Sequence, residues 1–389
     1  MTTGLQAVLS REIKRMKSET IYIWMLLALP LFTFIFFPTM FADGKADNYS
    51  VAIYDADNTP LSRKIISWIQ ATPEVNFTNK VISLHEGKRL IEKGEVYAVL
   101  KIPKGLEAGV YSGNPKKIIL QYSNINLSAG SGVSKAILTV VKTMSAGINL
   151  QKRISKEEMY DQALQNVQPI RLDTHALYNP YINYSYFLVT GLLPVMLLMF
   201  ILSTTIYVVG SELKNTTASE WYKMSSESLI VALTGKLLPY TIIFMFEAYL
   251  IDSILLGVIG VPKHGSTIVL IIATTLFVLA YQAMGVLLII IMPNIRLALS
   301  IGAMYASLAF SFAGLTFPLI AMSGLMQNIA QIFPFTHYLQ IYINTEMKNL
   351  PLIYTLPSFG ALLIFVLLPL LFVPRLRALL TKEKYWGKS

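Results

Sequence analysis

Two acidic residues, Glu247 and Asp252, lie inside an apolar stretch that runs from residue 237 to residue 260. At about 1.5 Å per helical residue, Glu247 lies roughly 16 Å from Lys236, which is close to mid-bilayer if the stretch crosses a membrane. A carboxylate at that depth is costly and is a functional candidate by default. Three interpretations stay open: lining of a substrate path, pairing with a Thr or Ser of a neighbouring helix, or proton coupling.

Residues for other kinds of chemistry are missing or scattered. The chain has no cysteine, which excludes disulfides, zinc-thiolate sites and cysteine nucleophiles. Gly235-Lys236 is followed by Leu237, and no G-x-x-x-x-G-K-[ST] loop occurs that would cradle nucleotide phosphates. The four histidines form no cluster in the sequence: His85, His175, His264 and His337. We therefore predict no catalytic residue, no metal and no cofactor in this chain. Energy for active transport would come from an ion gradient or from another polypeptide.

The segment from residue 211 to residue 236 mixes polar and aromatic residues. Thr217 and Glu220 have the spacing of a capping box, which predicts the start of a short helix. Trp221 and Tyr222 then supply apolar and amphipathic anchors. From the residues alone, this pattern is typical of an amphipathic helix that lies flat at a membrane interface.

The composition predicts that these residues belong to a membrane protein. The 389 residues are 54% hydrophobic and only 14% charged, whereas soluble domains are nearer about 25% charged. A helix needs roughly 20 mostly apolar residues to cross the hydrocarbon layer. Six stretches qualify: 21–42, 186–210, 237–260, 266–292, 297–323 and 352–373. The first is too long for a signal-peptide core and no A-x-A site follows it, so we interpret it as an uncleaved transmembrane helix. The sequence thus predicts an all-α membrane bundle of six transmembrane helices, with helices 2–6 inside 186–373.

The distribution of Lys and Arg predicts how these helices are oriented. With both termini inside, the segments 1–20, 211–236, 293–296 and 374–389 hold thirteen of these residues, and the outer segments 261–265 and 324–351 hold two. We therefore expect a cytoplasmic, amphipathic N-terminal segment (1–20) and a cytoplasmic, basic tail (374–389). Residues 43–185 would then lie outside, because long loops translocate largely regardless of charge.

Residues 43–185 predict an inserted extracytoplasmic α/β domain. β-prone runs at 51–57, 75–82, 96–102 and 117–122 alternate with helical runs at 61–70, 83–93 and about 128–153. Basic pairs such as Lys116-Lys117 and Lys152-Arg153 raise the question of nucleic-acid or anionic-lipid binding. Because 13 acidic residues are interspersed and no single-sign stripe stands out, we interpret these lysines as a solvated face and expect no nucleic-acid partner.

Span five carries small residues at a spacing that lets helices approach closely: Gly302, Ala306, Ala309 and Ala313. Two interpretations stay open for them, packing inside the chain and a seam of a homodimer or heterodimer. After this span, Pro318, Pro334 and Pro351 interrupt the chain. Residues 324–346 are too polar and interrupted to span, so we predict a re-entrant or interfacial hairpin within 324–351 that caps the outer end.

Several segments, taken in order, resemble the membrane subunits of ABC-2 type ABC exporters, in the bacterial subgroup with a large extracytoplasmic domain between spans one and two. The matching segments are 51–58 (VAIYDADN), 94–100 (GEVYAVL), 102–105 (IPKG), Asn179-Pro180, 183–184 (NY), 210–212 (GSE), Thr217, 220–221 (EW), 235–240 (GKLLPY), Phe317-Pro318, Met322, Pro334 and 336–338 (THY). One departure is Thr216, where the family commonly has glycine.

The resemblance implies a permease subunit of an ATP-driven exporter in the bacterial inner membrane. ATP and Mg would bind to a separate ABC ATPase subunit, and a second permease subunit and membrane lipid would be further partners. A periplasmic adaptor protein is also an expected partner, and drugs, lipids and polymers all stay open as substrates. The residues implied in coupling to the ATPase are Glu212, Thr217, Glu220, Trp221 and Tyr222, and those of the outer re-entrant region are Phe317, Pro318, Pro334 and His337. The alternative is a non-transporting membrane scaffold or receptor whose outer domain binds a partner protein.

Overall fold

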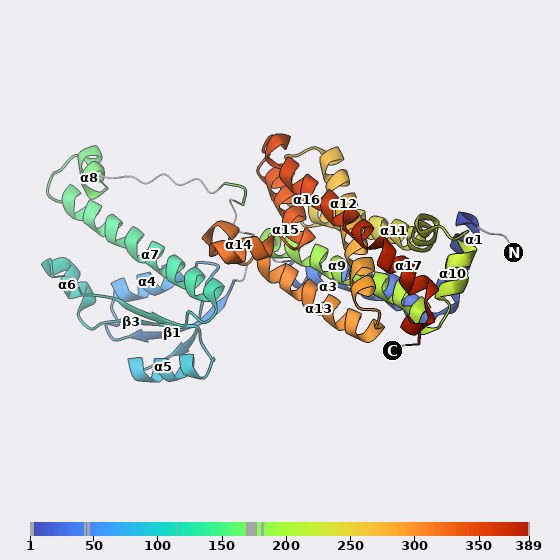
Figure 1. Ribbon diagram of the computed structural model, residues 1–389. Coiled ribbons are helices and arrows are strands. Elements are labelled where there is room, and N and C mark those ends of the chain that lie inside the picture. The colour runs from blue at the N-terminus through green and yellow to red at the C-terminus, as the bar shows by residue number, and fades with distance from the viewer. Residues whose placement is uncertain are drawn as a thin grey trace. The chain divides into compact units, whose positions relative to one another are not determined.

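The computed structural model of the chain describes residues 4–42, 44, 47–114, 116–168, 177–179 and 183–387. Two compact units emerge from the contacts: a helical bundle built from 1–44 and 176–389, and an α/β domain built from 45–175 (Figure 1). Two residues named above, His175 and Pro180, lie outside the described residues.

The α/β domain contains one four-stranded sheet with the order β2-β1-β3-β4. Its strands are β1 (Tyr49–Asp55), β2 (Val75–Lys80), β3 (Ala98–Ile102) and β4 (Ile119–Tyr122). β1 is parallel to β2 and β3, whereas β4 is antiparallel to β3. Alternate residues of the central strand face opposite sides, so Val51 and Ile53 join one hydrophobic cluster and Ala52 joins another.

Helices cover both faces of this sheet. α4 (Pro60–Gln70) and α7 (Leu127–Ile154) pack on the Val51 face, and α5 (Leu84–Glu92) packs on the Ala52 face (Figure 1). α5 comes close because Gly87 has no side chain; a Cβ there would lie 2.6 Å from the Val99 methyl groups. The predicted α/β domain is confirmed. Two short helices, α6 (Leu106–Ser112) and α8 (Tyr160–Val167), were not predicted.

Within the described part of the chain, six helical segments of the bundle are long and apolar enough to cross a membrane, which confirms the predicted number. They comprise α2 to α3 (Thr20–Met40), α9 (Tyr184–Lys214), α11 with its π-helical end (Leu229–Val258), α12 (Thr267–Ile291), α13 (Ile295–Phe312) and α16 to α17 (Leu356–Thr381). α9 and α12 are the most buried of the six and form the centre of the bundle.

Four predicted helix ends were wrong. α9 continues to Lys214 and α11 already begins at Leu229, so the predicted loop 211–236 shrinks to 215–228 and contains the short helix α10 (Ala218–Met224). α13 ends at Phe312 instead of residue 323, and the last helix continues through α17 (Val373–Thr381) into the predicted tail. A hydropathy pattern places the end of a helix where charged residues begin. The charged residues at the end of α9 and the start of α11 stay helical because they are paired.

The first and the last described residues lie with α10 at one end of the bundle (Figure 1). α1 (Leu5–Ser18) packs along α11, where a Cβ on Gly235 would lie 2.9 Å from Val8 Cβ. Near the other terminus, the Gly387 N–H donates to the Leu213 carbonyl oxygen at 3.0 Å. α17 also contacts α10.

The opposite end carries two short helices, α14 (Gly324–Ala330) and α15 (Pro334–Tyr342). The Tyr305 hydroxyl donates to the Ile332 carbonyl oxygen at 2.8 Å, and the Phe335 N–H donates to the Tyr281 hydroxyl at 3.3 Å. These tyrosines of α13 and α12 satisfy backbone groups at the turn between the two helices. Irregular backbone inside a membrane protein requires such partners.

Candidate functional site

A buried lysine joins three helices at the end of the bundle that carries α10. Lys236, in the second turn of α11, is completely buried, and its Nζ lies 2.7 Å from both Glu12 Oε2 and Glu212 Oε1. Glu12 belongs to α1 and Glu212 to the last turn of α9. The Tyr240 hydroxyl donates to the other oxygen of Glu12 at 2.7 Å. One ammonium group therefore ties α11 to both α1 and α9.

Glu212 is the residue with the most connections at this end. In addition to Lys236, it accepts from Arg11 Nη2 at 3.0 Å and from Arg15 Nη1 at 3.2 Å. The hydroxyl of Thr217, the residue that precedes α10, also donates to it. Glu212 thereby contacts α1, α11 and the start of α10 from its own position on α9.

Six charged side chains make up this group, which we name the charge cluster: Arg11, Glu12, Arg15, Glu19, Glu212 and Lys236. It contains three cations and three carboxylates, so its formal charge is zero. Burying charges is tolerated only when each has a close partner of opposite sign. Balanced pairing therefore explains how the helices stay packed around it.

Arg15 stays charged in these surroundings. Burial by itself would lower its pKa, but neighbouring Tyr22 and the carboxylates of Glu19, Glu212 and Glu12 outweigh burial and raise the pKa above its usual value. Its guanidinium also donates to the Ser211 hydroxyl at 2.9 Å. Arg15 thus acts as a permanent cation between α1 and α9.

α10 packs its aromatic residues inward. Trp221 is completely buried; its Nε1 donates to the Ala232 carbonyl oxygen at 3.3 Å, and Lys236 Nζ lies 4.9 Å from its ring centroid. Tyr222 is buried as well, whereas Glu220 and Lys223 are exposed. The residues that could touch another protein are therefore the charged ones, and the two aromatic residues hold α10 against the bundle.

The predicted capping box at the start of α10 was wrong. The Thr217 side chain makes no cap to α10, because its hydroxyl donates to the Glu212 carboxylate, and Glu220 faces solvent. A charged acceptor forms the stronger hydrogen bond. The preceding Thr216 adopts the left-handed backbone conformation, with φ 60°. That conformation favours glycine and explains why glycine suits this position, although the turn forms with threonine.

Glu247 and Asp252 are both buried in α11, but their surroundings differ. Asp252 Oδ2 accepts from the Thr274 hydroxyl of α12 at 2.9 Å, which is the pairing with a neighbouring helix considered above. Among the described residues, neither carboxylate oxygen of Glu247 has a hydrogen-bond partner. Structural pairing therefore accounts for one oxygen of Asp252, whereas its other oxygen and both oxygens of Glu247 have no partner among the described residues.

The small residues of span five face the interior of the chain. Gly302, Ala306, Ala309 and Ala313 are all buried, and a Cβ on Gly302 would lie 2.8 Å from Ile206 Cδ1 of α9. α13 packs on α9 along this line. The structure thus supports packing within the chain, and a seam with a second subunit at these residues stays a prediction.

The four residues of the predicted outer region are not brought together into one site. Pro334 and His337 lie on α15 and are buried, and His337 Nε2 is 3.0 Å from the Gln331 carbonyl oxygen. Phe317 and Pro318 are exposed. Within the described part of the chain, no group of three or more His, Asp or Glu side chains could hold a metal ion.

The sequence interpretation missed the partners of Glu212. Its partner Arg15 lies three residues after Glu12, on the same face of α1. Its partner Lys236, which also binds Glu12, interrupts an apolar helical run. Unpaired charges at such positions are the one signal that could have indicated a buried ion pair. Nothing local identifies their partners, because Glu12 and Lys236 are 224 residues apart.

The comparisons agree with this architecture. A family model described as ABC-2 family transporter protein matches residues 20–373, a range that includes all of the α/β domain and most of the bundle. No curated protein matches the chain. Permeases of this family do not hydrolyse ATP themselves, which fits the missing nucleotide-binding loop, and they work with an ATPase partner. The chain is therefore a multi-pass membrane permease that belongs to the ABC-2 transporter family.

Proposed function

We propose that this permease is an exporter, and that its ATPase partner binds at the end of the bundle formed by α1, α10 and α17. Family membership supports the need for an ATPase. The excess of Lys and Arg in the segments at this end supports a cytoplasmic location, where ATP is available. The substrate then moves away from that side, out of the cytoplasm or the inner membrane.

The connections of Glu212 are the observation that carries this proposal. The exposed face of α10, with Glu220 and Lys223, is the docking surface, and Thr217 and Trp221 connect α10 to the charge cluster behind it. Separating a buried ion pair costs about 3–5 kcal/mol. A displacement of α10 therefore moves α9 and α11 with it instead of breaking the cluster.

Glu247 is the residue for which we propose contact with the substrate path. It is buried in α11 and has no hydrogen-bond partner among the described residues in this conformation. A carboxylate in that situation is stabilised once a rearrangement of the helices exposes it to water or to a polar group of a substrate. Asp252 lies in the same helix and is already paired with Thr274.

A second permease subunit completes the transporter in this proposal. The chain has six spans among its described residues, which is half the number that the resemblance implies for a complete exporter. The α/β domain then lies outside the cytoplasm, where it is available to a periplasmic adaptor protein.

Co-purification tests the docking surface. The tagged chain is expected to bring its ATPase out of the membrane and to form a complex with vanadate-sensitive ATP hydrolysis. Reversing both exposed charges, with Glu220→Lys and Lys223→Glu, should reduce recovery of the ATPase without changing the thermal stability of the chain. The matched control is Lys348→Glu, which reverses an exposed charge at the opposite end of the bundle. Equal recovery from both variants would reject α10 as the docking surface.

A further inference from the structure

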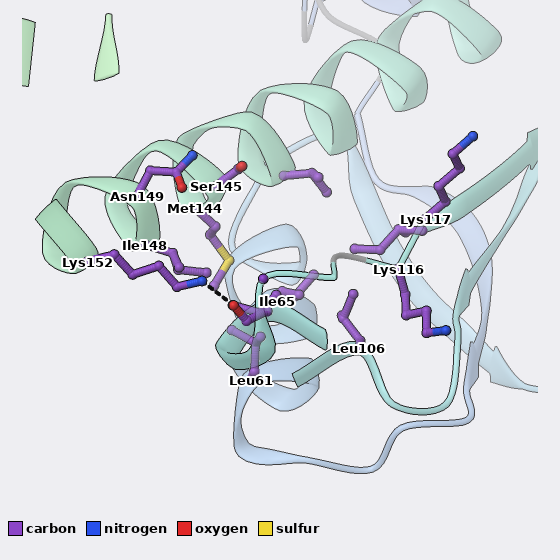
Figure 2. A pocket seen from close by; sticks show the side chains of 14 residues that line it. Leu61, Ile65, Leu106, Lys116, Lys117, Met144, Ser145, Ile148, Asn149 and Lys152 are labelled. Atoms are coloured by element: carbon purple, nitrogen blue, oxygen red, sulfur yellow. Dashed lines mark hydrogen bonds between the residues drawn. The ribbon is translucent and has the colours of Figure 1, made fainter. Parts of the chain in front are cut away.

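The α/β domain contains a cavity of about 540 Å³ between α4, α6 and the second half of α7 (Figure 2). This volume falls within the range of about 300–1,000 Å³ typical of small-molecule sites. The cavity exists because α7 leaves the sheet. Ala129, Val133 and Ile137 of its first half are buried in the core, whereas Ile148 is only partly buried.

Apolar side chains from three helices form the inner wall of the cavity. Leu61 and Ile65 come from α4, Leu106 from α6, and Met144 and Ile148 from α7. Figure 2 shows the side chains of Met144 and Ile148 directed from α7 toward the two α4 residues. A ligand that fills this space must therefore present an apolar body, and a flexible Met wall adapts to its shape.

Three lysines surround this apolar wall. The Lys152 ammonium group points into the cavity and donates to the Val110 carbonyl oxygen, whereas the side chains of Lys116 and Lys117 start at the opposite rim and extend away from the cavity into solvent (Figure 2). Among the described residues, no carboxylate forms an ion pair with any of the three. Other basic residues of the domain do have such partners: Lys88 with Glu92, Lys93 with Glu95, and Arg153 with Glu158. Lys116 and Lys117 are exposed, and other exposed lysines of the domain such as Lys142 also lack an ion pair within the described part of the chain, so what sets the rim lysines apart is their place beside an apolar cavity.

We infer that this cavity binds a single-chain lipid with an anionic headgroup. The alkyl chain lies along the wall formed by Leu61, Met144 and Ile148, and the headgroup lies at the mouth of the cavity beside the Lys152 ammonium group, in the positive field to which Lys116 and Lys117 contribute from the rim. Each buried methylene raises the affinity roughly fourfold, because it leaves water for an apolar surface. Charge complementarity selects an anion over a cation or a neutral alcohol of the same chain length.

Photo-crosslinking in the full chain tests the site. The protein is placed in lipid nanodiscs with a myristate analogue that carries a diazirine in its alkyl chain, and the labelled peptides are identified by mass spectrometry. We expect labels on α6 near Leu106 and on α7 near Met144. Unlabelled myristate should compete, whereas tetradecanol and tetradecyltrimethylammonium should not.

Two variants test whether the labelling of α6 and α7 depends on the cavity or comes from general contact with lipid. Ser145 is exposed and lines the cavity, so Ser145→Trp fills the space from its edge and should reduce labelling of α6 and α7 roughly tenfold. Lys116→Glu with Lys117→Glu should reduce it about fivefold or more, the effect of losing and reversing exposed charge contacts. Lys142→Glu is the control, because Lys142 is exposed on α7 and does not line the cavity.

Three results would overturn the assignment. These are labels confined to the bundle helices, equal labelling by a cationic probe with the same photoreactive chain, or full labelling of the Ser145→Trp variant with an unchanged melting temperature. The cavity lies wholly within the α/β domain, so any of these results leaves the docking proposal for α10 untouched.

Discussion

Two buried ionisable residues of α11 show how much their partners matter. Lys236 has a carboxylate on each side at 2.7 Å, whereas Glu247 has no partner for either oxygen among the described residues. Buried charges of the first kind hold helices together, and those of the second kind are costly in the conformation described here. This difference supports the proposal that Lys236 links the helices mechanically and that Glu247 contacts the substrate path.

Removing the central cation is expected to destabilise the bundle strongly. Lys236→Met leaves the Glu12 and Glu212 carboxylates buried without their shared partner, which should cost about 3–5 kcal/mol. Thermal unfolding of the purified chain measures this. Lys223→Met is the matched control, because Lys223 is exposed and its loss should change stability by about 0.5 kcal/mol or less. Equal melting temperatures for the two variants would show that the charge cluster holds nothing together.

Asp57 gives the α/β domain a defined response to acid. Its carboxylate accepts from the N–H groups of Gly105, Leu106 and Glu107 and from the Thr59 hydroxyl. Burial alone would raise its pKa, but the Thr59 hydroxyl and the three N–H groups outweigh burial and lower the pKa. A carboxyl group whose pKa is lower in the folded state contributes stability above its unfolded pKa, about 3.9.

This contribution should disappear as the pH falls below that value toward the folded pKa. Asp57→Asn cannot ionise, so we expect the variant to be less stable than the parent near neutral pH and to lose less stability on acidification. The melting temperature of the α/β domain, followed from about pH 6 to about pH 3, measures both. Parallel curves for parent and variant would contradict the role of this carboxylate.

At the scale of elements, α10 depends on a buried aromatic residue. Trp221→Ala removes a completely buried side chain and should cost about 3–5 kcal/mol. We expect α10 to loosen and binding of the ATPase to fall. Trp221→Phe keeps most of the packing and should restore much of the binding. Glu220→Ala changes only an exposed residue, so binding should fall partly and stability should not change.

Glu247→Gln is the control for that series, because Glu247 lies in α11 away from the exposed face of α10. ATPase recovery measures all four variants, and we expect Glu247→Gln to spare it and to alter transport alone. Full ATPase binding by Trp221→Ala would leave α10 as a simple interfacial helix. Coupling would then have to be sought in α1, where Leu5, Leu9 and Ile13 form an amphipathic stripe.

The sequence predicts elements whose signal is local and misses those that depend on distant partners. Strands such as β1 and β3 show continuous β-prone runs between turn residues, and the spans show long apolar runs, so both were predicted correctly. The end of α9 was not predicted correctly, because a hydropathy pattern treats Glu212 as the start of a loop. Only the fold supplies the partners, Arg11 and Lys236, that let this charge stay in a helix.

At the scale of the whole molecule, the same limit applies to the site. Glu212, Thr217 and Trp221 were named from the family resemblance, and the structure connects all three through the charge cluster. Their relation to α1 could not be predicted, since it depends on contacts across about 200 residues of sequence. The inward orientation of Trp221 could not be predicted either, because a short amphipathic helix does not reveal which face is covered.

The orientation of the molecule can be tested by cysteine labelling, since the chain has no cysteine of its own. If the charge asymmetry sets the orientation, single cysteines at Lys80 and Lys116 should react with a membrane-impermeant maleimide on intact cells. A cysteine at Lys384, in the basic tail, should react only after permeabilisation. The reverse pattern would place the α/β domain in the cytoplasm and would contradict export away from the α10 end.

The most direct test of the central claim is a cross-link between α10 and the ATPase. In the cysteine-free background, Lys223→Cys places one thiol on the exposed face of α10, and Lys348→Cys places one at the opposite end of the bundle. Each variant is purified with its ATPase and treated with a short thiol-to-amine cross-linker, and the adducts are resolved by electrophoresis and mass spectrometry. The account predicts a permease–ATPase adduct from Lys223→Cys and none from Lys348→Cys. An adduct from Lys348→Cys alone would contradict it.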